Sequence, residues 1–357
     1  MKILELKNTG KRFPEAKDWA VSDFNLEVSQ GEIVALLGES GCGKTTILRM
    51  IAGFETPSSG TIYLKGKLVA GDGVFTEPQN REVGIVFQDY ALFPHKTVWQ
   101  NVTFGLFNIP GEAAAQKARD ILELCGLTGL EKRYPHQLSG GQKQRVALAR
   151  AMAPEPGIIL FDEPFSNIDS MRKNQMRDDI SKIIRKTNAT AIFVTHDTKD
   201  VLAMADKVAV MKNGKALQTD TPETVYNYPV NIYVAHFFGK TNIIKAKVTE
   251  QGFVTPAGLI KTTQLPPQTG DEVIISIRPE QFQVVLNDSD CLKANVIRER
   301  FMGEYKELTC LATSPEGEKT EIIIYTPPQQ ICETGQCYFK PRNGKINIME
   351  SEVEIVR

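Results

Sequence analysis

A glycine-rich run, GESGCGKT at residues 38–45, carries the clearest chemistry in the sequence. It follows the apolar run 33–37 and opens a segment of helical period, in which Ile47 and Ile51 lie one turn apart. Glycines let such a loop fold its backbone N–H groups around phosphate oxygens, and the positive end of the following helix favours the anion. The run therefore predicts a phosphate-binding loop between a strand and a helix.

Two side chains of this loop have expected partners on a bound nucleotide. Lys44 is expected to reach the β- and γ-phosphates, and the Thr45 hydroxyl is expected to ligate Mg²⁺. The plain alternative is a glycine-rich turn that binds nothing, which the complete order of strand, loop, Lys-Thr and helix disfavours. The residues expected to bind the nucleotide here are Gly38, Glu39, Ser40, Gly41, Cys42, Gly43, Lys44, Thr45 and Thr46.

A pair of acids ends a second buried run, 158–161. A carboxylate at the carboxyl end of a strand beside a phosphate loop can hold Mg²⁺ directly or through water, and Asp162 is expected in that role. Glu163 points elsewhere and is expected to polarise a water against the γ-phosphate. Alone, the two acids would be interpreted as solvated residues at a strand end; beside a phosphate loop they predict a catalytic pair.

Two further polar residues follow predicted strands. His196 comes directly after the run 191–195, and Gln88 comes after the run 84–87. In a parallel sheet such strand ends collect on the ligand side, so both side chains are expected near the nucleotide. Gln88 would then sense Mg²⁺ or the γ-phosphate. A lone histidine or glutamine would carry no such meaning.

A third glycine-containing run, LSGGQ at 138–142, precedes a predicted helix. Ser139 is a plausible N-cap, and two glycines leave backbone N–H groups bare at the positive end of the helix. The run predicts either a second anion site or an ordinary capped helix start. The sequence of this run alone leaves both interpretations open.

Elements of two kinds divide the chain. Up to about residue 237, short apolar runs alternate with segments of helical period such as 113–124 and 142–152, which predicts a mostly parallel α/β sheet. Beyond it, short strand-like pieces separated by Gly, Pro and polar turns predict an all-β module, with a small barrel favoured. The predicted pieces are 273–277, 282–285, 322–325 and 346–348.

Composition excludes several classes of protein. The 357 residues carry 42 Lys and Arg against 43 Asp and Glu, so no broad positive field argues for nucleic acid or anionic lipid. No apolar run approaches bilayer length and the first ten residues are no secretory signal, so a cytosolic chain is expected. The tail cysteines lack paired metal-site spacing and are expected to be buried free thiols; they are Cys291, Cys310, Cys332 and Cys337.

Together the motifs resemble those of the ATP-binding cassette family of transport ATPases, over roughly residues 1–237. The phosphate loop, Gln88, the 138–142 signature, the Asp162–Glu163 pair and His196 stand in the order of that family. The resemblance implies ATP and Mg²⁺ as ligands. It also implies a homodimer, in which the signature of one copy closes on the ATP held by the other.

The resemblance assigns roles to individual residues. Those implied for catalysis are Glu163, His196 and Lys44. Those implied for Mg²⁺ are Thr45, Gln88 and Asp162. Those implied to act across the dimer interface are Ser139, Gly140, Gly141, Gln142 and the carboxylate of Asp169.

Two positions fit the family pattern less closely. An aromatic residue is expected to stack on adenine, for which Phe13 fits best and Trp19 is the rival. The loop 166–169 reads SNID where the family usually has SALD, so Asn167 is a departure that affects only details of dimer communication.

The implied fold class is α/β, a P-loop NTPase cassette with a mostly parallel sheet and a helical subdomain, followed by a smaller all-β OB-like domain. The expected nucleotide-binding domain is 1–238 and the expected OB-like regulatory domain is 239–357. The run 87–95 resembles importers that dock on membrane permeases, and 276–280 resembles an element of their OB-like domain. The implied protein is peripheral, on the cytoplasmic side of the inner membrane.

The implied cargo is the least determined feature. Runs 134–137 and 277–282 look closest to ferric-iron importers, with polyamine, sulfate or molybdate, and sugar importers as alternatives. Membrane permease subunits are the implied direct partners and a solute-binding protein an indirect one. Two other classes remain: a soluble cassette ATPase acting on DNA or the ribosome, and a non-hydrolysing binding module, which intact Lys44, Glu163 and His196 disfavour.

Overall fold

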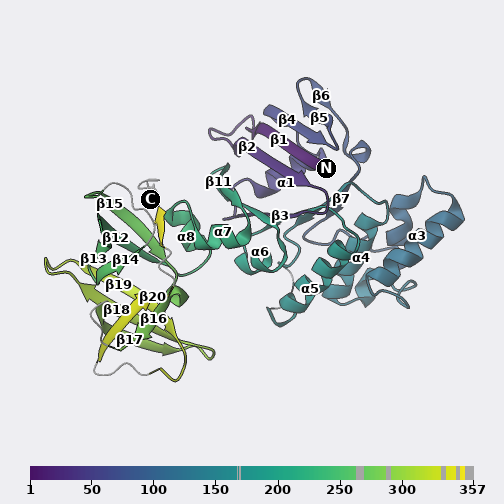
Figure 1. The fold of residues 1–357 in the computed structure, drawn as a ribbon. Coiled ribbons are helices and arrows are strands. Elements are labelled where there is room, and N and C mark those ends of the chain that lie inside the picture. The colour runs from purple at the N-terminus through teal and green to yellow at the C-terminus, as the bar shows by residue number, and fades with distance from the viewer. Residues whose placement is uncertain are drawn as a thin grey trace. The chain divides into compact units, whose positions relative to one another are not determined.

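The computed structural model describes residues 1–166, 168, 170–262, 269–286, 291–330, 335–342 and 346–349 (Figure 1). They belong to two compact units, Met1–Pro222 and Glu223–Arg357, each with its own hydrophobic core. The segment between this division and residue 238 holds α7 (Pro222–Asn227) and α8 (Ile232–Phe237). A functional boundary at residue 238 stays a prediction.

The first unit is built on a six-stranded sheet in the order β11-β10-β3-β9-β8-β7. Every neighbouring pair is parallel except β10 with β11, which confirms the predicted mostly parallel sheet. The strands are β3 (Ile33–Gly38), β7 (Val83–Val86), β8 (Ile158–Asp162), β9 (Ala191–Thr195), β10 (Lys207–Lys212) and β11 (Lys215–Asp220).

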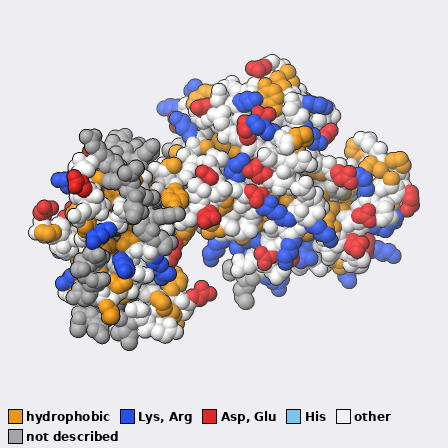
Figure 2. All heavy atoms as spheres, in the orientation of Figure 1, with side chains coloured by type: hydrophobic (Ala, Val, Ile, Leu, Met, Phe, Trp, Pro, Cys, Tyr) orange, Lys and Arg blue, Asp and Glu red, His pale blue; other side chains and the backbone are white. Residues whose placement is uncertain are grey.

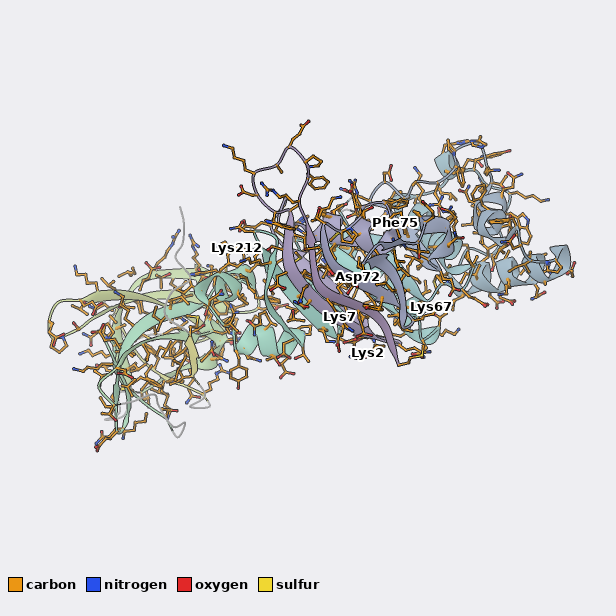
Figure 3. All side chains as sticks on the ribbon, turned by 90° about the horizontal axis from the view of Figure 1, so that it is seen from above. Lys2, Lys7, Lys67, Asp72, Phe75 and Lys212 are labelled. Atoms are coloured by element: carbon orange, nitrogen blue, oxygen red, sulfur yellow. The ribbon has the colours of Figure 1, made fainter. Side chains whose placement is uncertain are left out.

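A second, antiparallel sheet of this unit was not among the predicted elements. Its order is β2-β1-β4-β5-β6, and Lys2, Lys7 and Lys67, labelled in Figure 3, are exposed residues of its strands. The strands are β1 (Lys2–Lys11), β2 (Val21–Ser29), β4 (Ser59–Leu64), β5 (Lys67–Gly71) and β6 (Val74–Phe75).

The helices confirm the predicted segments 113–124 and 142–152, which fall in α3 and α4. Helices α2, α3 and α4 pack on one another as a helical subdomain at one side of the unit (Figure 1). The helices are α1 (Lys44–Ala52), α2 (Val98–Thr103), α3 (Gly111–Leu124), α4 (Gly140–Met152), α5 (Ser170–Lys186) and α6 (Thr198–Met204), with 3₁₀ turns η1 (Pro78–Asn80), η2 (Phe104–Leu106) and η3 (Pro135–Gln137).

Helix α1 lies in the core that the two sheets share. Ile47 and Ile51, one turn apart as predicted, are both fully buried, together with Phe24 from β2 and Leu36 from β3. Complete burial of such a side chain contributes about 1.5–3 kcal/mol. The packing therefore fixes the amino end of α1, and with it the phosphate loop, against β3.

The second unit confirms the predicted all-β module. Its described strands form two five-stranded antiparallel sheets, β14-β13-β12-β15-β21 and β16-β20-β17-β18-β19, around one core. Besides α7, α8 and the turn η4 (Pro279–Gln281), the described elements of this unit are β12 (Asn242–Thr249), β13 (Gly252–Thr255), β14 (Gly258–Lys261), β15 (Glu272–Ile277), β16 (Phe282–Val285), β17 (Leu292–Phe301), β18 (Lys306–Thr313), β19 (Lys319–Thr326), β20 (Gln336–Pro341) and β21 (Asn347–Met349).

The expectation of a buried free thiol holds for Cys310, in the core of the second unit. Cys337 is buried in the same core and Cys291 is half-buried. Cys332 lies outside the described residues. Among the described residues, no group of three His, Cys, Asp or Glu side chains is placed to hold a metal ion.

Arg278 joins α7 and α8 to the β-rich part of the second unit. Its side chain is only 2% exposed, and its guanidinium donates hydrogen bonds to the carbonyl oxygens of Tyr226, Ala235 and Lys240 at 3.0–3.2 Å. The guanidinium also lies over the Tyr226 ring, 4.2 Å from its centroid. These contacts explain why 223–238 belongs to the second compact unit.

Replacing this arginine is expected to destabilise the second unit. Arg278→Met leaves several buried carbonyl oxygens without donors, each costing about 1–3 kcal/mol, so the free energy of unfolding should fall by about 3 kcal/mol or more. The matched control is Arg298→Met, because Arg298 is exposed on β17 and its loss should change stability by no more than about 0.5 kcal/mol. Denaturant titration measures both, and equal small effects would contradict the assigned role of Arg278.

Charges are mixed on the molecular surface. Figure 2 shows Lys and Arg side chains interspersed with Asp and Glu over the first unit, with no broad patch of one sign on the face in view. In the part of the chain that the structure describes, no helix is long and apolar enough to cross a bilayer.

Candidate nucleotide site

Four neighbouring strands bring the predicted residues to one edge of the parallel sheet. In the order β3-β9-β8-β7, Leu37 pairs with Thr195, Asp162 with Val194, and Val86 with Phe161. The carboxyl ends of these strands are therefore level with one another. The residues that follow at this edge are the phosphate loop, His196, Glu163 and Gln88, as the sequence predicts.

The phosphate loop needs glycine at a defined position. Gly43 is the N-cap of α1 with φ 103°, and a Cβ there would lie 2.3 Å from the Ala20 carbonyl oxygen. Gly41 also has a positive φ, 85°, but nothing lies within 4 Å of its Cβ position. Glu39, Ser40 and Gly41 are exposed. The loop is thus packed on its inner side and accessible to a ligand on its outer side.

Lys44 is folded onto this loop. Its side chain is buried, and Nζ donates hydrogen bonds of 2.8 Å to the carbonyl oxygens of Gly38 and Glu39. The Cys42 Sγ is 3.7 Å away. The ammonium group is therefore held at the mouth of the loop, where its charge attracts phosphate.

Thr45 and Asp162 form the candidate Mg²⁺ position. The Thr45 hydroxyl donates to Asp162 Oδ1 at 3.2 Å, across 117 residues of sequence. Burial raises the pKa of Asp162, and the neighbouring Glu163 charge raises it too, although the Thr45 hydrogen bond acts against both. A half-buried carboxylate and a hydroxyl are oxygen donors that suit Mg²⁺ together with phosphate oxygens, and a cation would compensate the desolvated charge. The residues fit the ion.

Removing the Asp162 charge is expected to stabilise the nucleotide-free chain. Since the folded chain raises the pKa of Asp162, the charged form is disfavoured by folding, and Asp162→Asn should raise the free energy of unfolding at pH 7. The gain should shrink as the pH falls through the raised folded pKa toward the unfolded value. Denaturant titrations at pH 7 and pH 5 measure it, and a loss of stability at pH 7 would contradict the role of burial.

Glu163 and His196 lie next to one another. Glu163 Oε1 is 3.5 Å from His196 Nδ1, and the two side chains are 24% and 55% exposed. Glu163 has a left-handed backbone, φ 44°, and its carbonyl oxygen accepts hydrogen bonds from both the backbone N–H and the hydroxyl of Ser166. The buried Gln144 of α4 donates to the next carbonyl, that of Pro164. This turn presents the carboxylate at the strand edge beside the histidine.

The loop after Gln88 is held by an arginine that the sequence did not single out. Tyr90 and Ala91 both have left-handed backbones, φ 67° and 44°. Arg150 of α4 donates to both of their carbonyl oxygens, at 3.1 and 2.6 Å, and lies over the Phe93 ring. The strained pair is thus stabilised by the helix that begins at the signature run.

The signature run begins α4 with the predicted cap. Ser139 Oγ accepts from the Gln142 N–H at 3.3 Å, and Gln142 Oε1 accepts from the Ser139 N–H at 2.9 Å. A cavity of about 440 Å³ lies here, lined by Ser139, Gly140, Gly141 and Gln142 with residues of α5. None of its lining residues belongs to the phosphate loop. Within one chain, therefore, this cavity does not bring the signature and the loop together.

The adenine position stays open between two aromatic residues. Phe13 is 38% exposed, with Lys11 Nζ 5.1 Å from its ring centroid, and Trp19 is 41% exposed and lies against Gly10. Both follow β1 in the chain, and Phe13 remains the predicted stacking residue. Asp169, the predicted interface carboxylate, lies outside the described residues, as does Asn167.

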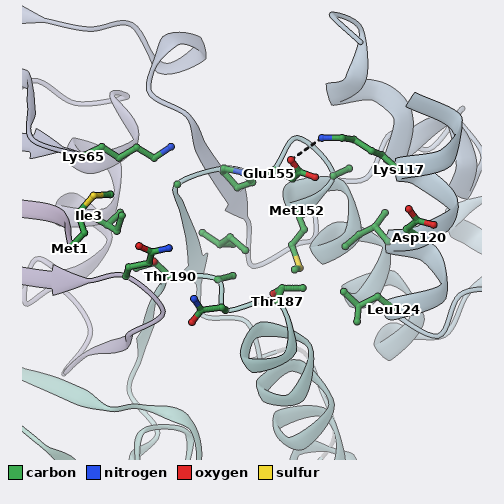
Figure 4. A pocket seen from close by; sticks show the side chains of 18 residues that line it. Met1, Ile3, Lys65, Lys117, Asp120, Leu124, Met152, Glu155, Thr187 and Thr190 are labelled. Carbon is green, nitrogen blue, oxygen red and sulfur yellow. Dashed lines mark ion pairs between the residues drawn. The ribbon is translucent and has the colours of Figure 1, made fainter. Parts of the chain in front are cut away.

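A cavity of about 690 Å³ lies away from this edge (Figure 4). It is lined by residues at the amino ends of β8 and β9, including Ile159 and Thr190, and Lys117 of α3 forms an ion pair there with Glu155. None of its lining residues belongs to the predicted site. Cavity size therefore does not mark the predicted phosphate site.

A second arginine near the site was also missed, and this one is buried. Arg177 of α5 is 4% exposed and contacts Asp197 and Asp200, which follow His196. The sequence does carry a signal: Arg177 precedes the buried Ile180 and Ile184 by three and seven residues, so a charge stands in the apolar stripe of the helix.

Comparisons with known proteins identify the family of the chain. Residues 21–166 match the family described as ABC transporter. The chain is 46% identical to the "Trehalose/maltose import ATP-binding protein MalK" of Thermococcus litoralis, over 73% of this chain and 74% of that protein. It is 43% identical to the "Fe(3+) ions import ATP-binding protein FbpC 2" of Haemophilus influenzae, over 79% of each.

A solved structure shows the same cassette fold. It is described as the dimeric structure of a post-hydrolysis state of the ATP-binding cassette MJ0796 bound to ADP and Pi. The match has a TM-score of 0.54 and 30% identity, and covers 62% of this chain and 99% of that one.

Proposed function

The chain belongs to the ABC transporter family and is an ATP-hydrolysing importer subunit, and from this premise we propose that it works as a homodimer beneath a membrane permease. The observation that carries the proposed ATP site is the hydrogen bond from Thr45 to Asp162, which joins the phosphate loop to the acid of β8. Glu163 and His196 stand at the same strand edge, 3.5 Å apart.

In the proposed site each residue has one task. The loop N–H groups and Lys44 bind the phosphates, Glu163 orients or deprotonates the attacking water, and His196 contacts the γ-phosphate. Thr45, Gln88 and Asp162 would hold Mg²⁺, which would supply positive charge to offset that of the phosphates. Positioning and electrostatics thus supply most of the catalysis.

The homodimer completes each site. Ser139 and Gly140 are exposed at the positive end of α4, a suitable cap for the phosphates of ATP held by the other copy. The solved cassette MJ0796, similar to this chain, is a dimer. Two bound ATP molecules close the proposed pair and turn the permease outward. Hydrolysis then adds like charge at the interface between the two copies and releases the γ-phosphate contacts, and the dimer reopens.

Ferric iron is the proposed cargo. The relative from Haemophilus influenzae is named an Fe(3+) import protein, and the more identical relative from Thermococcus litoralis is named a trehalose/maltose import protein, so a sugar is the first alternative. Polyamines and sulfate or molybdate are others. The permease and a solute-binding protein would select the cargo, with this chain peripheral on the cytoplasmic side of the inner membrane.

A soluble cassette ATPase acting on nucleic acid is the candidate of a different class. The net charge of −1 and the mixed surface of Figure 2 disfavour it.

Purification from native membranes tests the proposed partners and cargo. The tagged chain should bring down permease subunits, and proteoliposomes of the complex should take up Fe³⁺ from its binding protein only when ATP is enclosed with the chain. If the complex took up maltose or spermidine instead, that solute would replace ferric iron as the proposed cargo. Recovery of ribosomes or DNA without permease would overturn the importer partnership.

A further inference from the structure

We propose that Arg177 is a positioning residue that holds the loop carrying His196, a role that rests on the proposed contact of His196 with the γ-phosphate. Arg177 comes from α5, whereas His196 follows β9. The guanidinium donates from Nε to Asp200 Oδ1 at 2.5 Å and from Nη2 to Asp197 Oδ2 at 2.9 Å. One side chain therefore binds residues one and four positions beyond the histidine.

The residue before the histidine is part of the same network. The Thr195 hydroxyl donates to Asp200 Oδ2 at 2.6 Å and accepts from the Asp197 N–H at 3.0 Å. Asp197 Oδ1 in turn accepts from the Lys199 N–H, which caps α6. Both backbone neighbours of His196 are thereby fixed, while the imidazole itself stays 55% exposed toward the ligand edge.

Burial makes the network depend on the arginine. The side chains of Arg177 and Asp200 are 4% and 3% exposed. Desolvation raises the pKa of Asp200, so its charge is unfavourable unless a cation compensates it. The other charged group at Asp197 is Lys173, at 3.8 Å on the exposed side. Without Arg177, Asp200 would lose the cation that its carboxylate contacts among the described residues.

A buried ion pair is an expensive way to stabilise a helix, since an apolar side chain of similar size is often as good or better. The placement of the Arg177–Asp200 pair instead matches a requirement for a fixed position of His196. Helix α5 follows Glu163 in the chain. Arg177 therefore connects the loop that carries His196 to the segment that follows Glu163. Because a misplacement of about 1 Å can cost about 100-fold in rate, such a tie affects turnover.

The first test replaces the arginine and compares it with a second arginine of the same helix. Arg177→Met should lower kcat about tenfold or more and leave ATP affinity within about threefold, since the phosphate loop is untouched. The control is Arg185→Met. Arg185 pairs with Asp206 at the exposed end of α5, the two side chains being 43% and 41% exposed, and its loss should change kcat less than twofold.

A structural readout separates positioning from stability. The chain has four histidines, so the imidazole signals of ¹³C-labelled histidine can be assigned with His196→Ala. In Arg177→Met the His196 signal should shift or broaden in the nucleotide-free chain, whereas in Arg185→Met it should not. Arg177→Met leaves the buried Asp200 without its ion-pair partner and could unfold the chain. A milder variant is therefore included. Thr195→Val keeps the shape, removes the hydroxyl, and should move the same signal and lower kcat about threefold or more.

The outcomes distinguish the inference from the proposed function. An unmoved His196 signal and unchanged kcat in folded Arg177→Met and Thr195→Val would overturn the positioning role. Normal turnover in His196→Ala would instead overturn the proposed task of the histidine, and the shifted signal in Arg177→Met would still support positioning.

Discussion

Glu163→Gln should lose at least about 100-fold in turnover and still bind ATP with near-normal affinity. Glutamine has the size of glutamate, and the left-handed turn is held by contacts of backbone groups, so the geometry persists while the charge that acts on water disappears. Phosphate release measures the loss, and equilibrium binding of labelled ATP measures the affinity.

The chain contains a matched control for this substitution. Glu155 also has a left-handed backbone, φ 56°, and its carboxylate pairs with Lys117 beside the cavity at the amino ends of the strands. Glu155→Gln should therefore turn over at the wild-type rate. Near-normal turnover in Glu163→Gln would remove Glu163 from the proposed role, whatever the control shows.

Lys44→Met should lower the rate of ATP hydrolysis by about 100- to 1000-fold. Unlike Glu163→Gln, it should also weaken ATP binding. The ammonium group is the buried cation of the phosphate loop, and methionine keeps the length of the side chain without its charge. Removing one such preorganised donor costs about that factor in other enzymes. The same two assays measure both effects.

Lys65→Met is the control for a lost lysine charge, because Lys65 is exposed and pairs with Glu82. It should change neither hydrolysis nor binding. If Lys44→Met kept wild-type affinity and turnover, the loop could not be the phosphate-binding element.

The site could be predicted from the sequence where function depends on short, local runs. The phosphate loop needs a glycine at residue 43 for backbone reasons. The buried apolar runs of β3, β8 and β9 lead into the glycine-rich loop or into polar residues. Parallel order then places these ends together without knowledge of the full topology. The contact of Thr45 with Asp162 follows from this rule.

Long-range polar contacts could not be predicted in the same way. Arg150 binds carbonyl oxygens that two left-handed residues expose 59 and 60 positions earlier, and no spacing rule links them. The antiparallel sheet was not predicted, although β2 carries a signal for it, since its residues from Phe24 onward alternate between buried and exposed. Arg278 shows the same limit in the second unit, where one side chain satisfies carbonyls of two helices.

The proposed ATP site, formed by two copies of the chain, is tested most directly by the ATP-dependent pairing of two different variants. One chain carries Lys44→Met and the other Gly140→Asp, both with Glu163→Gln to prevent turnover. A side chain at Gly140 has room within its own copy, where the nearest atom lies 3.8 Å from the Cβ position, but its carboxylate would repel phosphates of the other copy. Only the unlike pair then contains one complete site.

With donor and acceptor fluorophores on the two chains, ATP and Mg²⁺ should raise energy transfer in the unlike mixture and in Glu163→Gln alone. Neither variant mixed with itself should respond. No rise in the unlike mixture, or an equal rise in the like mixtures, would contradict a nucleotide bound between two copies of this chain.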